Sequence, residues 1–337
     1  MRYLTLIAAL LLLLSSCEAY LEEKLEFLEL PFEYEGRLQT NNFSPDWDLA
    51  WGVPDNGDPN AVYFVTGWGD VYYWESGASW YYRSITYNHR TPLASMSVKM
   101  AHVEIFFGGT DDELLIISST GAAGPVNTGI VNERSLMFAS ENLCYLANLE
   151  QVSLTSSLII QAYNTDPLVP TITGPVDILA VDNVEYNDVV AAAFPDADTT
   201  WGPVAVDFLA FAPAPLSSFE GKHKFILART DGLTGERRVM LVSVDETDYS
   251  IAVRRLSADG SFHFVSRDRF VGMDGDTLKI FNSSGEELAD YELEGMRLLG
   301  FRSSTDPELV FLYRSEEDGD RVFGIYSLPA AFVREAR

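Results

Sequence analysis

Short runs of β-forming residues, separated by turn residues, extend through the chain from Pro45 onward. Val, Ile, Phe and Tyr are frequent in these runs, and Gly, Pro, Asn or Asp bound them. Clear examples are residues 61–65, 103–107, 114–118, 158–163, 204–211 and 238–244. No segment of this region keeps the periodicity of an amphipathic helix over an ordinary helix length. The pattern predicts an all-β protein.

The C-terminal part shows a repeat. One unit contains tight turns at residues 274–276 and 282–285, and a second unit contains the acidic turn at residues 316–320. Each unit is a meander of short strands that recurs at roughly 35–45 residues, the size of one four-stranded blade. In this rhythm the chain resembles β-propeller proteins, and the resemblance implies a single propeller of about six or seven blades. Another multi-sheet β architecture in two domains is the alternative.

The N-terminus has the layout of an export signal. A basic residue precedes an uncharged apolar run over residues 3–14. This run is too short for a transmembrane helix, which needs about 20 residues. Leu14, Ser15, Ser16 and Cys17 follow, and this order resembles the bacterial lipobox. The resemblance implies diacylglyceryl transfer to the Cys17 sulfur, cleavage after Ser16, and acylation of the new amine by a fatty acid such as palmitate.

The lipobox divides the chain into three predicted parts. These are a lipoprotein signal peptide over residues 1–16, a lipidated tether with a candidate closing strand over residues 17–44, and a propeller-like domain over residues 45–337. The acyl chains on Cys17 would hold the protein at a membrane of the bacterial cell envelope. Glu18, rather than Asp, follows the cysteine, and this favours the outer over the inner membrane.

The predicted tether contains one alternating segment. Leu30, Phe32 and Tyr34 are separated by the single residues Pro31 and Glu33. A period of two favours a strand, and a proline confines such a strand to an edge or to its end. An amphipathic helix over residues 21–28 is the alternative for the front half of the predicted tether.

Charge and cysteine content restrict the partners. The chain has 23 Lys and Arg against 50 Asp and Glu, a formal net charge of -27, which becomes -28 when Arg2 is removed with the signal peptide. Nucleic acid and anionic lipid headgroups require basic surface, so neither is an expected partner. With Cys17 lipidated, Cys144 has no disulfide partner, and its apolar neighbours predict a buried free thiol.

The usual catalytic signatures are missing from the sequence, including G-x-S-x-G, H-E-x-x-H, the phosphate-binding loop and paired CxxC. The four histidines lack metal-ligand spacing; they are His89, His102, His223 and His263. Four aspartates around one Gly/Pro loop do not follow the order of a known calcium loop; they are Asp46, Asp48, Asp55 and Asp58. We therefore predict no catalytic residue, no metal and no cofactor.

A block of aromatic residues extends from Trp68 to Tyr87. Side chains alternate between the faces of a strand, so Tyr72 and Trp74 share one face. If one face of this block packs on a neighbouring sheet, the other can present rings to a sugar or a peptide. The candidates for this ligand surface are Trp68, Tyr72, Trp74 and Trp80. A core between blades is the alternative.

These observations favour a lipid-anchored envelope protein that acts as a non-catalytic binding or assembly module on a propeller scaffold. The expected partners are the membrane, through Cys17, and an unknown envelope protein or glycan. A surface glycan-binding protein or glycoside-active enzyme is the alternative. It depends on the aromatic block and on Asp196, Thr200 and Trp201, which partly resemble the Asp box of sialidase-type propellers.

Overall fold

The computed structural model describes the chain at two levels of detail. Backbone and side chains are described for residues 30–38, 61–62, 74–75, 210, 224–228, 230, 235–243, 245, 250, 252–266, 268–302, 306–314 and 323–337. The remaining strand residues between 51 and 322 are described by their backbone alone. The predicted boundaries after residues 16 and 44 lie outside the described residues.

The described strands form six four-stranded antiparallel sheets, which we call blades 1 to 6. Blade 1 contains β2 (Trp51–Pro54), β3 (Ala61–Val65), β4 (Asp70–Glu75) and β5 (Arg83–Thr86). Blade 2 contains β6 (Leu93–Lys99), β7 (Glu104–Gly109), β8 (Glu113–Ser118) and β9 (Gly121–Asn127). Blade 3 contains β10 (Leu136–Ser140), β11 (Leu143–Val152), β12 (Thr155–Asn164) and β13 (Thr173–Val181).

The C-terminal half supplies the other three blades. Blade 4 contains β14 (Val204–Phe211), β15 (Lys222–Asp231), β16 (Arg237–Asp245) and β17 (Ile251–Arg255). Blade 5 contains β18 (Phe262–Phe264), β19 (Arg269–Asp274), β20 (Thr277–Asn282) and β21 (Glu287–Glu292). Blade 6 contains β22 (Met296–Arg302), β23 (Glu308–Glu317), β24 (Asp320–Pro329) and, from the other end of the chain, β1 (Glu33–Leu38).

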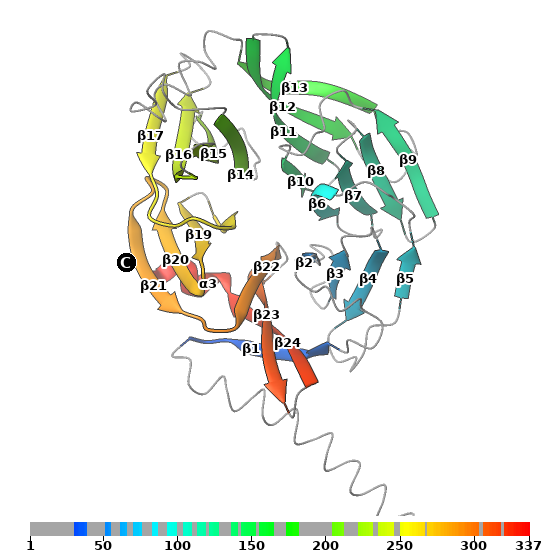
Figure 1. The fold of residues 1–337 in the computed structure, drawn as a ribbon, viewed down its shortest axis with the longest axis vertical. Coiled ribbons are helices and arrows are strands. Elements are labelled where there is room, and N and C mark those ends of the chain that lie inside the picture. Colours follow the sequence, from blue (N-terminus) through cyan, green and yellow to red (C-terminus); the bar gives the residue numbers. More distant parts are fainter. Residues whose placement is uncertain are drawn as a thin grey trace, which may run out of the picture.

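The six blades form a closed ring (Figure 1). The first strand of each blade contacts the first strand of the next, in the cycle β2, β6, β10, β14, β18, β22 and back to β2. Blades arranged radially around a ring of inner strands define a β-propeller. The predicted all-β single propeller is therefore confirmed, with six blades among the described strands, and the two-domain alternative is not the architecture formed.

The N-terminal strand β1 completes blade 6. It lies on the outer side of β24, antiparallel, with Glu33 opposite Ser327 and Leu38 opposite Phe323. Pro31 precedes the strand, where its missing N–H removes no bond from the sheet. Residues close to the start of the chain thus share a sheet with residues close to its end, and this pairing fastens the ring (Figure 1).

Both faces of the C-terminal blades are buried. On β23, Leu309 and Phe311 belong to the core shared with blade 5, whereas Val310 and Leu312 belong to the core shared with blade 1. Alternation along the strand sends successive side chains to these two cores. This explains why β23 begins as a nearly continuous apolar run instead of alternating with polar residues.

The helix α3 (Ala330–Glu335) follows β24 and ends the described chain. Its buried residues Ala330 and Val333 join the core between blades 5 and 6, and Phe332 packs on Tyr291 of β21, with ring centroids 5.5 Å apart. Within the described residues, no helix combines the length and the apolar character that crossing a membrane requires.

A glycine permits close packing in the aromatic core between blades 4 and 5. Gly272 on β19 lies opposite Phe262 on β18, and a Cβ at Gly272 would lie 2.6 Å from Cε1 of that ring. Phe270 stacks on Phe281 in the same core, with centroids 4.9 Å apart. The Phe262 ring therefore has little room to move away from an added methyl group.

We predict that Gly272→Ala lowers the free energy of unfolding by about 1–3 kcal/mol, because the added methyl group overpacks this core. The midpoint of urea denaturation measures the effect. Phe262→Leu removes the ring edge that the methyl group would meet, so it should cost less stability in the Gly272→Ala background than in the native protein. Strictly additive losses would contradict the contact.

Candidate functional site

The most developed polar site in the described residues lies at the ring closure. Arg302, at the end of β22, is the one charged residue among the described side chains that is buried. Its Nη1 donates to Glu35 Oε1 of β1 at 3.2 Å and to Glu308 Oε2 of β23 at 3.1 Å. Its Nη2 donates to the Ala61 carbonyl of β3 at 3.3 Å. One guanidinium thus connects blade 6, its closing strand and blade 1.

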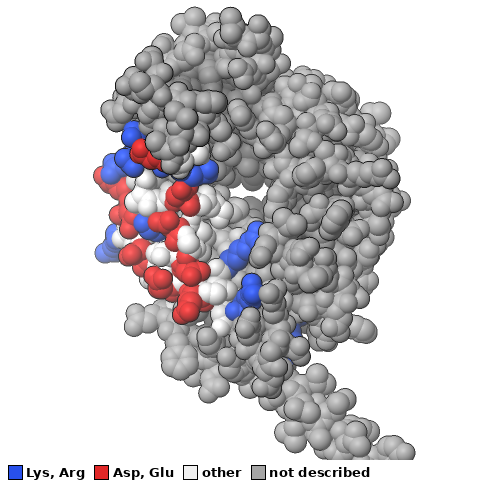
Figure 2. Space-filling view, in the orientation of Figure 1, with Lys and Arg blue, Asp and Glu red and all other residues white. Residues whose placement is uncertain are grey.

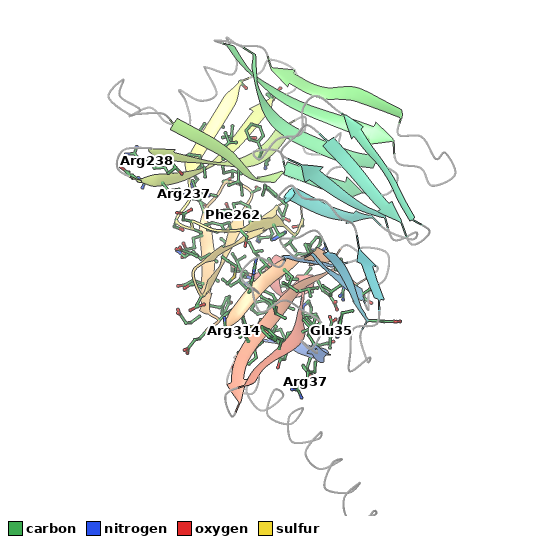
Figure 3. The ribbon with its side chains drawn as sticks, turned by 45° about the vertical axis from the view of Figure 1, so that its right-hand side comes forward. Glu35, Arg37, Arg237, Arg238, Phe262 and Arg314 are labelled. Atoms are coloured by element: carbon green, nitrogen blue, oxygen red, sulfur yellow. The ribbon has the colours of Figure 1, made fainter. Side chains whose placement is uncertain are left out.

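A β-bulge aims Glu35 at this arginine. Tyr34 pairs with Tyr326 and Gly36 pairs with Ile325, so Glu35 is an extra residue on β1. In a regular strand, residues three apart face opposite sides. The bulge shifts the alternation, so Glu35 and Leu38 lie on the same side of β1: Glu35 binds Arg302, which also contacts blade 1, and Leu38 joins the core shared with blade 1. Gly36 has a φ of 151°, which a residue with a side chain rarely adopts. Figure 3 labels Glu35 on β1.

The carboxylates of this closure cluster, which we define as Arg302, Glu35 and Glu308, repel each other. Burial raises the pKa of Glu308 above its ordinary value, and the charges of Glu35 and Glu33 raise it further, against the opposing effect of Arg302. Their side chains are largely shielded from solvent, with 10% of Glu35 and 20% of Glu308 exposed. The cluster is therefore an ion-pair network with a surplus of negative charge.

Trp74 lies beside the closure cluster and is a core residue. Its side chain is fully buried between blades 1 and 6, in contact with a cluster that contains Leu38 of β1. Its Nε1 donates to the carbonyl of Arg37 on β1 at 3.3 Å. The prediction that Trp74 contributes to a ligand surface is therefore wrong. The alternative holds at this residue, because the space between two blades is filled best by large flat side chains.

The structure leaves the other predicted site residues as predictions. Tyr72 lies on β4 opposite Phe64, and Cys144 lies on β11 opposite Tyr163, with only their backbones described. Cys17, Trp68 and Trp80 lie outside the described residues, as do the four aspartates around the Gly/Pro loop and the partial Asp box. Among the side chains that the structure describes, no group of three or more His, Cys, Asp or Glu could hold a metal ion.

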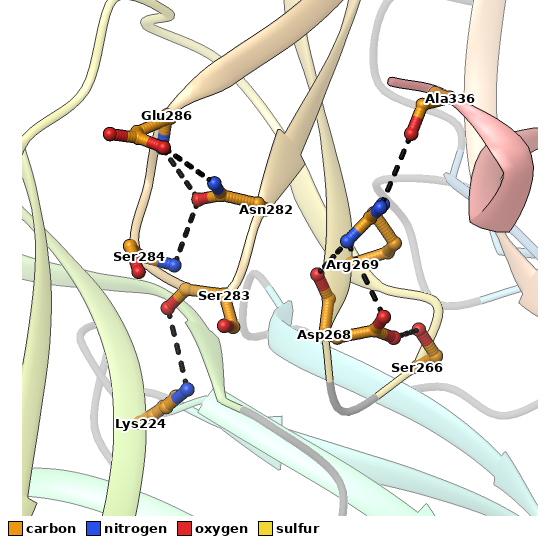
Figure 4. A network of polar contacts seen from close by, with 9 residues as sticks. All are labelled: Lys224, Ser266, Asp268, Arg269, Asn282, Ser283, Ser284, Glu286 and Ala336. Atoms are coloured by element: carbon orange, nitrogen blue, oxygen red, sulfur yellow. Dashed lines mark hydrogen bonds and ion pairs between the residues drawn. The ribbon is translucent and has the colours of Figure 1, made fainter.

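A second polar network joins blade 5 to its neighbours (Figure 4). Asn282 Oδ1 accepts bonds from the backbone N–H groups of Ser284 and Glu286, each at 2.9 Å, and so shapes the turn between β20 and β21. Lys224 Nζ of blade 4 donates to the Ser283 carbonyl at 3.3 Å. On the other side, Arg269 Nη2 donates to the Ala336 carbonyl after α3 at 3.2 Å. Lys224 therefore connects blade 4 to blade 5, and Arg269 connects blade 5 to the segment after α3.

The outer edge of blade 5 is strongly acidic (Figure 2). The exposed carboxylates on and beside β21 are Glu286, Glu287, Asp290, Glu292 and Glu294. An outer strand presents unpaired backbone groups, and charged side chains oppose pairing with another chain there. The acidic edge therefore accounts for part of the negative charge of the protein without indicating a ligand.

His263 lies at the edge of the core between blades 5 and 6. It is half-buried on β18, between the buried Phe262 and Phe264, and pairs with Val271 on β19. Burial lowers the pKa of His263 from 6.5 to about 4. The imidazole is therefore neutral at pH 7. The sequence offered no signal for this beyond its apolar neighbours.

No protein-family model matches the chain, and a search of curated proteins found no match. Solved propeller structures do resemble the fold loosely. The Cps50 (Swd1) propeller of Myceliophteria thermophila is 10% identical, covers 82% of this chain and 96% of its own, and has a TM-score of 0.46. The Pan2 WD40 domain of Neurospora crassa is 8% identical, covers 88% and 95%, and has a TM-score of 0.45. The fold assignment itself stands on the sheet topology.

We predict that Arg302→Met lowers the free energy of unfolding by about 3–5 kcal/mol, because Glu35 and Glu308 then lose their shared counter-ion in a buried site. Denaturant titration measures the loss. The triple variant that adds Glu35→Gln and Glu308→Gln should recover much of it. The control Arg254→Met breaks only an exposed ion pair with Glu286 and should cost less than about 1 kcal/mol. Equal losses for Arg302→Met and the control would contradict the role of the cluster.

We predict that His263 makes the fold less stable in mild acid. The unfolded chain takes up a proton near pH 6.5, whereas the folded imidazole resists it until about pH 4. Stability therefore falls as the pH drops between these values, by about 1–3 kcal/mol for this group. His263→Gln should remove this part of the loss when denaturation is compared at about pH 7 and pH 4.5. An unchanged pH dependence in the variant would contradict it.

Proposed function

We propose that this protein is a lipid-anchored scaffold of the bacterial cell envelope, a propeller that binds or assembles other envelope components without catalysis. The observation that supports it best is the position of β1. The strand that completes blade 6 begins at Glu33, sixteen positions after Cys17, so the lipobox and the ring closure are close together in the sequence.

The closing strand β1 is bound tightly to the ring, so an anchor on Cys17 would hold the whole folded domain. Leu38 is buried with 1% exposed, Arg37 accepts a bond from Trp74, and Glu35 pairs with Arg302. An acylated Cys17 would therefore be joined to a folded ring through a short tether. Residues 18–32 reach about 50 Å at most when fully extended. The proposed anchor thus keeps blade 6 close to the membrane.

The placement of charged side chains between elements supports a scaffold. Arg302, Lys224 and Arg269 each donate hydrogen bonds that join one blade or element to the next. A rigid ring presents the loops of many blades at its two ends, which suits recognition of a partner; this is an argument from architecture alone. An envelope protein is the partner class that we propose. We favour the outer membrane over the inner one, because Glu18 stands where an Asp would resemble a signal for retention in the inner membrane.

The anchor is tested by Cys17→Ala in a host that processes lipoproteins. The native protein should fractionate with membranes, incorporate a palmitate analogue, and begin at a diacylglyceryl-modified Cys17 in intact-mass measurement. Cys17→Ala should lose the label and the membrane association. Cys144→Ala, the matched control, should keep both, because Cys144 is the one other cysteine in the chain. A native product with an unmodified Cys17, or one still beginning at Met1, would overturn the proposal.

A further inference from the structure

We propose that the closure cluster is a proton-linked latch: Glu308 takes up one proton from the medium when β1 docks, so that mild acid tightens the ring closure and neutral or alkaline medium loosens it. The proposal stands on the geometry of blade 6 and is independent of the proposed membrane anchor.

The closure cluster contains two carboxylates and one guanidinium, and this imbalance favours the uptake of a proton. Glu35 and Glu308 both accept from the same nitrogen of Arg302, at 3.2 and 3.1 Å, so the two carboxylates must lie close together. The same guanidinium also serves the Ala61 carbonyl. One positive charge therefore faces two carboxylates and a carbonyl dipole in a site from which Arg302 is fully shielded. A proton on one carboxylate removes the repulsion and leaves an oxygen that can still accept from Arg302.

The groups around Glu308 identify it as the acceptor of the proton. β1 contributes Glu33 and Glu35, β22 contributes Arg302, and β24 contributes the uncharged Pro329 as the pairing residue. Asp306 lies in the turn just before β23. Burial and the two glutamates of β1 raise the pKa of Glu308, and only Arg302 lowers it.

Docking of β1 changes this environment, and therefore the proton occupancy. When β1 leaves, Glu33 and Glu35 leave with it and Glu308 gains solvent, so its pKa returns toward the ordinary value. Because the pKa is raised only in the closed state, protonation favours closure. The added stability of closure is complete below the ordinary glutamate pKa and disappears as the pH rises through the raised one.

The remaining contacts of β1 do not depend on this proton. The antiparallel ladder to β24, the burial of Leu38 and the bond from Trp74 to Arg37 hold the strand at any pH at which the protein is folded. The latch therefore adjusts how often β1 opens instead of deciding whether it binds. Its signature is a loss of protection with rising pH that is confined to β1 and the facing segment of β24.

Amide hydrogen exchange of the full-length protein, corrected for intrinsic rates, tests the latch between about pH 5 and pH 8. Protection of residues 33–38 should fall by about threefold or more as the pH rises, since one unit of pKa difference corresponds to a tenfold linkage. Protection of β20 in blade 5 should not fall over the same rise in pH, because His263 makes the fold less stable only toward acid. Glu308→Gln should keep β1 protected and make the protection independent of pH. Asp306→Asn, the matched control two residues away, should retain the native profile.

Two results would overturn the latch. One is native protection of β1 that does not change with pH. The other is a Glu308→Gln variant that keeps the native slope. If Glu308→Gln does not fold, Glu35→Gln serves instead, because removing that charge lowers the pKa of Glu308 and should also flatten the slope. A slope shared equally by β1 and β20 would assign the effect to the whole ring and count against a local latch.

Discussion

The structure depends on the burial of both faces of each blade. A sheet with two apolar faces is stable only between two neighbours, so a row of such sheets must close into a ring or expose a face at each end. Here the two ends meet where blade 6 packs on blade 1, through a core that contains Trp74, Val310 and Phe323. Arg302 adds a polar connection at the same place by bonding Glu35, Glu308 and the Ala61 carbonyl. The interface between blades 6 and 1, which closes the ring, therefore contains both an apolar core and an ion-pair network.

Local sequence patterns predicted the blades well, because the strands and turns of each blade are close together in the sequence. The turn at Asp274 to Thr277 uses Gly275 at a φ of 59°, which the sequence signals directly, and the strands on either side are marked by β-branched and aromatic residues. The spacing of such units sufficed to indicate a propeller. The number of blades was less certain because a missing or extra turn signal changes the count, and the strands settle it at six within the described chain.

The ring closure could not be predicted from the sequence in the same way. Glu35 and Arg302 are 267 positions apart, and nothing local to either residue shows that they meet. The one signal is Arg302, which follows the apolar residues 298–301 of β22, because an arginine that is buried beside such residues requires a counter-ion. The prediction for Trp74 was wrong for a related reason. Alternation gives the side of a strand on which a ring lies, but in a propeller both sides face another blade, so an aromatic residue has no exposed face by default.

Two opposing effects act on the closing strand: its contacts hold it in the ring, and carboxylate repulsion weakens that hold. A strand recruited from the start of the chain closes the ring without a covalent link, so it must be held by a long ladder and a buried core. Glu35 and Glu308 weaken that hold through their mutual repulsion, although a neutral pair would satisfy Arg302 less completely. Two glutamines would leave the guanidinium without a counter-charge, whereas two ionised glutamates carry more negative charge than one guanidinium can neutralise. One proton shared with the medium balances the cluster better than either fixed arrangement, and this is the physical reason that the closure of the ring is sensitive to pH.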